Sequence, residues 1–369
     1  MSADVEIVLI AIVVAAACAI PGVFLILRRM AMMSDAISHT VLLGIVGVYL
    51  LIGDLDSPLL LVGAAAVGVL TVTMVEIVTR TKLVNEDAAI GIIFPGLFAL
   101  AIVLLSVYAR DVHLDEHVVF QGDLVFAPFD RLVIGGVDLG PRTLVTMVVI
   151  LTLNLALISL LYKELKLATF DAGLAAALGF SPVLVHYLLM TMVSITAVGA
   201  FDAVGSILVI ALMVVPPASA YLVTDRLSWM LALSVGIGAT GALGGFWLSR
   251  WLDTTIGGSM VAMIGVIFAV CFLFAPDRGV VAIARRRLRQ RWDFAQTMLA
   301  IHLLHHEGTP EADIESRVDH LWEDLRWEPD FAEQVVRYAE RRGVVRRSAG
   351  LLSLTSEGRG IAQEALVRS

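Results

Sequence analysis

Nine long apolar runs separated by short polar connections dominate the chain between residues 5 and 275. Crossing about 30 Å of hydrocarbon takes roughly 20 helical residues, which is close to the length of each run. The runs cover residues 5–27, 37–53, 58–78, 88–108, 143–162, 183–200, 204–223, 228–248 and 260–275. The second begins just after a polar patch, and the sixth and seventh are separated by only three residues, so eight spans is the alternative count. The pattern predicts an all-α polytopic membrane protein with about nine transmembrane helices.

The connections between these runs differ in charge from one side to the other. Short loops rich in Lys and Arg stay in the cytoplasm. Alternate connections carry Arg28, Arg29, Arg80, Lys82, Lys163, Lys166, Arg226, Arg278 and the arginines between Arg285 and Arg291. The opposite connections hold fewer basic residues among several acidic ones. We therefore expect the N-terminus outside and the C-terminus in the cytoplasm.

The pattern changes after Arg291. Residues 292–306, 310–326 and 329–342 have helical spacing of apolar positions, with Pro310 and Pro329 placed as helix starters. Residues 343–354 are typical of two short strands around a turn, and a last helix follows. We expect a small cytoplasmic winged-helix-like α+β domain at 285–369, after a transmembrane domain at 1–284.

Composition supports a membrane protein. Of the 369 residues, 59% are hydrophobic and 16% charged, whereas a soluble domain is about half apolar and a quarter charged. Residues 285–369 hold 14 Arg and 14 Asp or Glu, so the net charge of −8 belongs to residues 1–284, and neither part is a basic nucleic-acid binder.

The sequence contains no GxxxxGK[ST] phosphate-binding motif. We expect a protein that is not an enzyme, with any ATP hydrolysis on a separate polypeptide.

Asp35 and His39 lie in a polar patch beside the second run. At i and i+4 on a helix, their side chains share a face about 5–6 Å apart. A carboxylate and an imidazole can both ligate a divalent ion, and this mixture of donors suits Mn, Fe or Zn. The alternative is that both side chains sit at the membrane boundary, capping a helix or bonded to Ser34 and Ser38. The spacing alone leaves both interpretations open.

The connection at residues 162–182 is the longest predicted cytoplasmic loop within the membrane part. Asp171 can cap a short alanine-rich helix, and Gly179 can end it. Such a helix is either a docking surface for a soluble partner or an ordinary interfacial helix.

Other polar or helix-breaking residues lie along the spans. Pro216 and Pro217 interrupt the seventh run, which indicates either a pore-lining kink or a packing kink. Glu76 either lines a path or reaches the interface. The external segment 113–117 (HLDEH) either recruits a cation or is simply solvated. The candidate pathway residues are Glu76, Asp202, Pro216 and Pro217.

Four stretches, taken together, resemble the permease subunits of zinc, manganese and iron ATP-binding-cassette importers. They are residues 28–44 (RRMAMMSDAISHTVLLG), 120–124 (FQGDL), 162–182 (YKELKLATFDAGLAAALGFSP) and 204–222 (VGSILVIALMVVPPASAYL), and the resemblance spans about residues 5–278. It implies a metal site at Asp35 and His39 in the translocation path. It also implies a coupling helix that docks on a cytoplasmic ABC ATPase through Asp171, Ala172, Ala175, Ala176, Leu178 and Gly179.

The resemblance further implies partners and a location. These are a homodimer or a pair with a sister permease, an extracytoplasmic metal-binding protein that delivers the ion, and a multi-pass position in the cell (inner) membrane among its lipids. No cofactor is expected to stay bound; the metal is cargo. The tail departs from the commonest family pattern, and residues 354–360 (LTSEGRG) resemble the wing and last helix of metal-dependent repressors. Because the tail has no net charge and is tethered, we expect a regulatory or partner-contact role and no DNA binding.

We therefore expect a permease that passes a divalent transition metal, manganese first and then zinc or iron, into the cytoplasm. Two rival functions remain. An ion-coupled secondary metal transporter would work without an ATPase, and a membrane-anchored metal-responsive regulator would bind DNA through its tail.

Overall fold

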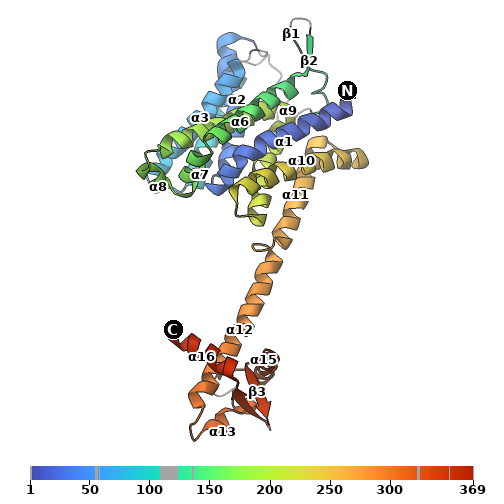
Figure 1. Ribbon diagram of the computed structural model, residues 1–369. Helices are drawn as coiled ribbons and strands as arrows, with labels where there is room; N and C mark the ends of the chain where they lie inside the picture. The colour runs from blue at the N-terminus through green and yellow to red at the C-terminus, as the bar shows by residue number, and fades with distance from the viewer. Residues whose placement is uncertain are drawn as a thin grey trace. The chain divides into compact units, whose positions relative to one another are not determined.

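The chain consists of two compact units, Met1–Gly279 and Val280–Ser369, which are described separately. The computed structural model describes residues 2–54, 57, 59–108, 124–134, 137–321, 325–348 and 350–368 (Figure 1). The segment 113–117 and residues 120–123 of the FQGDL stretch lie outside these residues.

The first unit is built from long apolar helices (Figure 1). Their bounds are α1 Ala3–Leu27, α2 Ala31–Ile52, α3 Leu59–Arg80, α4 Glu86–Tyr108, α6 Arg142–Leu160, α9 Pro182–Val223, α10 Leu227–Leu252 and α11 Ile256–Phe274. Because α9 contains two apolar segments, the described residues hold nine helical segments long and apolar enough to cross a membrane. The expectation of about nine spans is confirmed.

Helix α1 lies at the centre of this unit. It packs against α6, α9 and α10. In its apolar membrane-length stretch, 78% of the residues are buried, compared with 17% in the corresponding stretches of α4 and α11. Alanines 15–17 and Ala19 let neighbouring helices approach closely, as small residues do in membrane bundles. A second group forms where α2 packs on α3, α4 and α9.

The second span begins earlier than its hydropathy predicts. Helix α2 starts at Ala31, six residues before the expected start at 37, so the whole polar patch lies inside the helix. Its hydroxyls are satisfied locally: Ser34 Oγ donates to the Ala31 carbonyl and Ser38 Oγ to the Ser34 carbonyl, both at 2.8 Å. A helix whose polar side chains bond its own backbone does not need an apolar sequence there.

The sixth and seventh spans are continuous in α9 except at one residue. Gly205 has φ 74° and ψ 165°, a backbone conformation that glycine adopts without steric cost. The two apolar segments of α9 are Pro182–Phe201 and Ala203–Val223, and Gly205 lies near the start of the second.

A two-stranded hairpin precedes α6 and was not expected in an all-α membrane unit. Strand β1, Arg131–Ile134, pairs antiparallel with β2, Val137–Pro141, and the register shifts between Arg131 and Val133. The available signal was the Gly-Gly pair at 135–136 between β-branched residues, which is typical of a hairpin connection.

The second unit contains α12 Val280–His306, α13 Ala312–Glu315, a 3₁₀ turn at Val318–His320, α15 Pro329–Arg341, strands β3 Val345–Ser348 and β4 Leu351–Leu354, and α16 Ser356–Arg368. Strands β3 and β4 pair antiparallel, as the sequence predicts. Apolar residues from α12, α15, the hairpin and α16 form a core separate from that of the first unit.

The expected helix over 310–326 is wrong. Within the described residues of that segment, helical structure is interrupted: α13 has four residues, a 3₁₀ turn follows, Leu321 and Leu325 are again helical, and Pro310 does not start a helix. The backbone here is used differently, because Leu352 N donates to the Ser316 carbonyl at 2.8 Å and Arg317 forms an antiparallel bridge with Leu351. Pairing with β4 excludes a continuous helix through these residues.

Candidate metal path and coupling segment

Asp35 and His39 lie next to each other on α2. His39 Nε2 is 3.4 Å from Asp35 Oδ1, and the two side chains are 25% and 30% exposed for His39 and Asp35, respectively. The residues between and beside them, Ser34 and Ala36 to Ser38, are buried. The two side chains are therefore on the accessible side of a helical turn whose other residues are packed. Ser34 and Ser38 bond helix carbonyls, so their hydroxyls are not partners of this pair.

The His39 ring is held against two aromatic residues of α4. Its centroid lies 5.6 Å from the Phe94 ring in a stacked arrangement and 5.8 Å from the Phe98 ring edge-on. These contacts restrict the imidazole to one side while leaving part of it accessible.

Glu76 lies near the end of α3 and pairs with its neighbour one turn on. Arg80 Nη2 donates to Glu76 Oε1 at 2.7 Å, and Arg80 is well exposed. Asp202 stands at the junction of the two halves of α9, and its side chain lies outside the described part of the chain. The structure does not bring Glu76 into contact with the Asp35–His39 pair in any interaction between described residues.

Pro216 and Pro217 are buried in the second half of α9. A proline has no N–H to donate to the carbonyl four residues back, so Pro217 leaves the Met213 carbonyl without its helical partner. That carbonyl lies against Gly22 of α1: a Cβ built on Gly22 would be 1.9 Å from its oxygen. In the single chain the prolines therefore shape the packing of α9 on α1.

The segment around 171–179 forms the local structure that its sequence predicts. Helix α7 covers Tyr162–Phe170, and the six-residue α8 covers Ala172–Ala177. Between them Asp171 is the N-cap, its Oδ1 accepting a hydrogen bond from Leu174 N at 2.9 Å. Gly179 ends the segment at φ 87°. Of the coupling residues expected from the sequence, Ala175 is buried, while Leu178 is 61% exposed.

Several apolar side chains of this segment face outward. Phe170, Leu174, Leu178 and Phe180 are all exposed, which is a concentration of apolar surface on a short polar-capped turn. Exposed apolar patches of this kind mark contact surfaces more often than isolated exposed leucines do.

Arg28, at the end of α1, links α7 to α9. The sequence did not reveal this role. Arg28 follows α1, its Nε donates to Thr169 Oγ1 at 3.2 Å, and its Nη1 lies 3.3 Å from His186 Nδ1. The signal in the sequence was only its position among the basic connections. The guanidinium is part-buried and shared between α7 and α9.

A cavity of about 360 Å³ opens beside the same segment. Its lining includes Phe170 from α7, Arg29, and the polar groups of Asp225 and Arg278. Arg278 pairs with Asp225 and stacks over the Tyr221 ring, 4.3 Å from its centroid.

Comparison with known proteins decides the family. Residues 5–275 match the ABC 3 transport family. The chain belongs to the ABC 3 transport family. It is 46% identical over 361 residues to the zinc transport system membrane protein TroD of Treponema pallidum, covering 98% of each chain.

Two further comparisons agree with this membership. This chain is also 46% identical over 291 residues to the manganese transport system membrane protein MntD of Bacillus subtilis. The match covers 79% of this chain and 98% of MntD. Among solved structures, PsaBC from Streptococcus pneumoniae, in complex with Fab, superposes with a TM-score of 0.63 at 29% identity, over 75% of this chain and 94% of that chain. The similarity to TroD extends over nearly the whole chain and so includes the second unit, whereas the match to MntD covers 79% of the chain.

Proposed function

We propose that this chain is the membrane permease subunit of an ATP-driven importer that moves a divalent transition metal into the cytoplasm. The cargo is manganese first, and zinc or iron next. The names of the zinc and manganese transport relatives support this class of cargo. The observation that carries the proposal is the Asp35–His39 pair, a carboxylate and an imidazole 3.4 Å apart on an otherwise packed helix.

Asp35 and His39 would act by replacing water ligands of the passing ion. Both side chains keep about a quarter or more of their surface accessible, which leaves room for further ligands. Two protein ligands per chain form a weak site, and a transport site has to release its ion. A second permease, identical or a sister chain, would supply another pair, and an extracytoplasmic metal-binding protein would deliver the ion.

Residues 171–179 would dock on a separate ABC ATPase. The outward apolar side chains of this segment, including Leu174 and Leu178, support a protein contact there. Arg28, bonded to Thr169 and His186, would carry a movement of α7 to the ends of α1 and α9. ATP hydrolysis on the partner would then alternate access to the metal pair.

The charge of the connections supports an N-terminus outside, a cytoplasmic C-terminus and a place in the inner membrane. The assignment of residues 280–369 as a winged-helix-like unit remains a proposal, supported by a hairpin with helices before and after it, and we assign this unit a regulatory or partner-contact role rather than DNA binding.

The test is metal-dependent uptake by the reconstituted complex with its ATPase, with and without ATP. We expect Asp35→Ala and His39→Ala to reduce uptake at least tenfold, because each removes half of the chain's ligand pair. Asp253→Asn is the matched control, an exposed acid at the end of α10. Normal uptake by both variants would contradict the assignment of Asp35 and His39 as the metal site. Uptake without the ATPase would favour a secondary transporter.

A further inference from the structure

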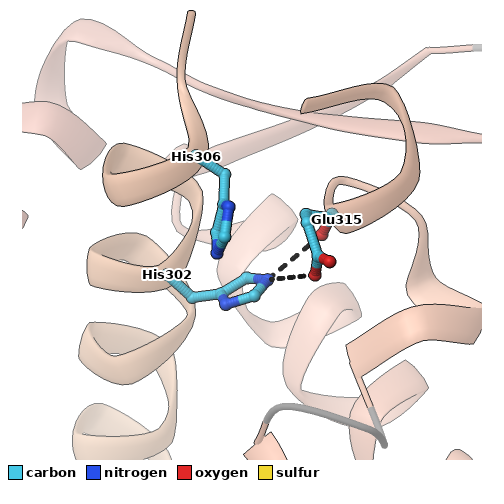
Figure 2. A group of neighbouring side chains, drawn as sticks. All are labelled: His302, His306 and Glu315. Carbon is cyan, nitrogen blue, oxygen red and sulfur yellow. Dashed lines mark hydrogen bonds and ion pairs between the residues drawn. The ribbon is translucent and has the colours of Figure 1, made fainter. Parts of the chain in front are cut away.

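A second group of metal-ligand residues lies in the second unit, in residues that the proposed transport function does not use. His302, His306 and Glu315 each place one ligand atom within 4.8 Å of the others (Figure 2). His302 and His306 are one turn apart on α12, with ring centroids 4.8 Å apart. Glu315 is the last residue of α13 and faces them from a separate segment.

The group is largely buried. The His302 side chain is 7% exposed and that of Glu315 14%. Oε2 of Glu315 is buried and receives no hydrogen bond from any described residue, while His302 Nε2 is 3.8 Å away and His320 Nδ1 3.6 Å away. A buried carboxylate is costly unless a positive charge or several donors face it. The surroundings of Glu315 offer imidazoles, which compensate that charge when protonated or when they share a cation with it.

The donor set matches a transition metal. Two imidazoles and one carboxylate are the three protein ligands of many zinc sites, and imidazole with carboxylate also suits manganese and iron. His302 Nε2 lies 3.1 Å from the Glu315 backbone carbonyl. The same nitrogen faces the Glu315 carboxylate, 3.8 Å from Oε2 (Figure 2), so Nε2 is the atom that His302 offers to an ion shared with Glu315.

The spacing requires only a small closure. Tetrahedral bonds of about 2.0–2.2 Å put ligand atoms roughly 3.3–3.6 Å apart. The present separations of up to 4.8 Å therefore have to shrink by about 1.5 Å or less. His306 and Glu315 are less buried than His302, so this closure is assigned to rotation of these two side chains.

We propose that His302, His306 and Glu315 bind one divalent transition metal ion of the zinc class. The ion ties the C-terminal end of α12 to α13, and His320 orients the Glu315 carboxylate from its other side. This site is independent of the Asp35–His39 pair, and it stands whether or not the proposed transport function is correct.

The experiment uses the full-length, untagged chain in detergent, carrying Asp35→Asn and His39→Ala so that the transport pair does not contribute. After incubation with Zn²⁺ and removal of excess metal, elemental analysis counts the bound zinc. We expect one ion per chain in this background. Adding His306→Gln or the isosteric Glu315→Gln should weaken binding at least about tenfold, since even partners of metal ligands are worth 10–100-fold. His305→Gln, an exposed histidine on the same helix, should retain the ion.

A second measurement tests whether the ion links α12 to α13. Zn²⁺ should slow hydrogen exchange of the amides at 309–317 in the background chain and in the His305→Gln chain, and should have no such effect in the His306→Gln chain. Full zinc occupancy in both the His306→Gln and Glu315→Gln chains would overturn the proposal. So would a background chain that elutes as a folded protein and binds no zinc.

Discussion

Asn154 of α6 donates a hydrogen bond from Nδ2 to the backbone carbonyl of Ala17 in α1, at 3.2 Å. The Ala17 carbonyl has no partner within α1, because the residue four positions later is Pro21, which has no N–H to donate. Asn154 is buried, and the same nitrogen lies 2.9 Å from Thr196 Oγ1 of α9. One amide thus joins three helices at a proline in the central one.

We expect Asn154→Leu to destabilise the protein by about 1 kcal/mol, because hydrogen bonds between membrane helices are worth about 0.6 kcal/mol on average and up to about 1.7. Reversible unfolding in mixed micelles measures this cost. In a Pro21→Ala background the new N–H satisfies the Ala17 carbonyl, so the same substitution should cost less. Equal costs in the two backgrounds would contradict the assignment.

Gly22 of α1 is expected to tolerate no side chain. A Cβ there would lie 1.9 Å from the Met213 carbonyl oxygen, and backbone cannot move aside as a flexible side chain can. Overpacking of this kind costs about 1–3 kcal/mol. Gly22→Ala should therefore lower the melting temperature of the purified chain.

Gly236 of α10 is the matched control for that substitution, because a Cβ there meets no heavy atom within 4 Å. Gly236→Ala should leave the melting temperature unchanged or raise it, since alanine favours a helix over glycine by about 1 kcal/mol. A similar loss of stability in both variants would mean that close packing on Met213 is not the cause.

Asp171 is expected to act through its helix cap. Asp171→Ala removes the acceptor for Leu174 N and should cost α8 about 1 kcal/mol. We expect ATP-dependent metal uptake by the reconstituted complex to fall. Asp171→Asn keeps a capping oxygen and should retain most uptake. If the asparagine variant is as impaired as the alanine variant, the carboxylate charge matters and the cap does not explain the effect.

Glu333 in α15 links the pH to the stability of the second unit. Partial burial raises its pKa, but hydrogen bonds from Arg347 and Arg337 outweigh this and hold the pKa of Glu333 below its ordinary value. Because the folded-state pKa is the lower one, the stabilisation is present above the unfolded value of about 4.3 and is lost as the pH falls through the folded pKa. Hydrogen-exchange protection factors for α15 and β3 should drop as the pH falls below about 5 and through the folded pKa of Glu333, and less so in Glu333→Gln.

Features set by neighbouring residues could be predicted from the sequence. The apolar runs determine the number of spans, because a helix must be long enough to cross the hydrocarbon whatever its neighbours are. The Asp171 cap, the Gly179 terminus and the hairpin of β3 and β4 are also local, each depending on a few consecutive residues.

Two predictions of local structure failed. In one, polar side chains form hydrogen bonds within their own helix, and in the other, a segment distant in sequence determines the backbone conformation. The start of α2 was misplaced because Ser34 and Ser38 bond their own helix, which hydropathy does not register. The segment 310–326 was expected to be helical, but its backbone pairs with β4 at Leu351 and Leu352. Neither interaction leaves a periodic signal in the sequence.

The sequence by itself determined the membrane class, the approximate number of spans and the i, i+4 spacing that makes Asp35 and His39 neighbours on any helix. Only the tertiary structure decided which face of α2 meets Phe94 and Phe98, and which side chain reaches the carbonyl freed by Pro21. It also brought Glu315 to the histidines of α12. The physical reason is that packing between elements selects contacts from many equally apolar alternatives, whereas helix geometry alone sets contacts within an element.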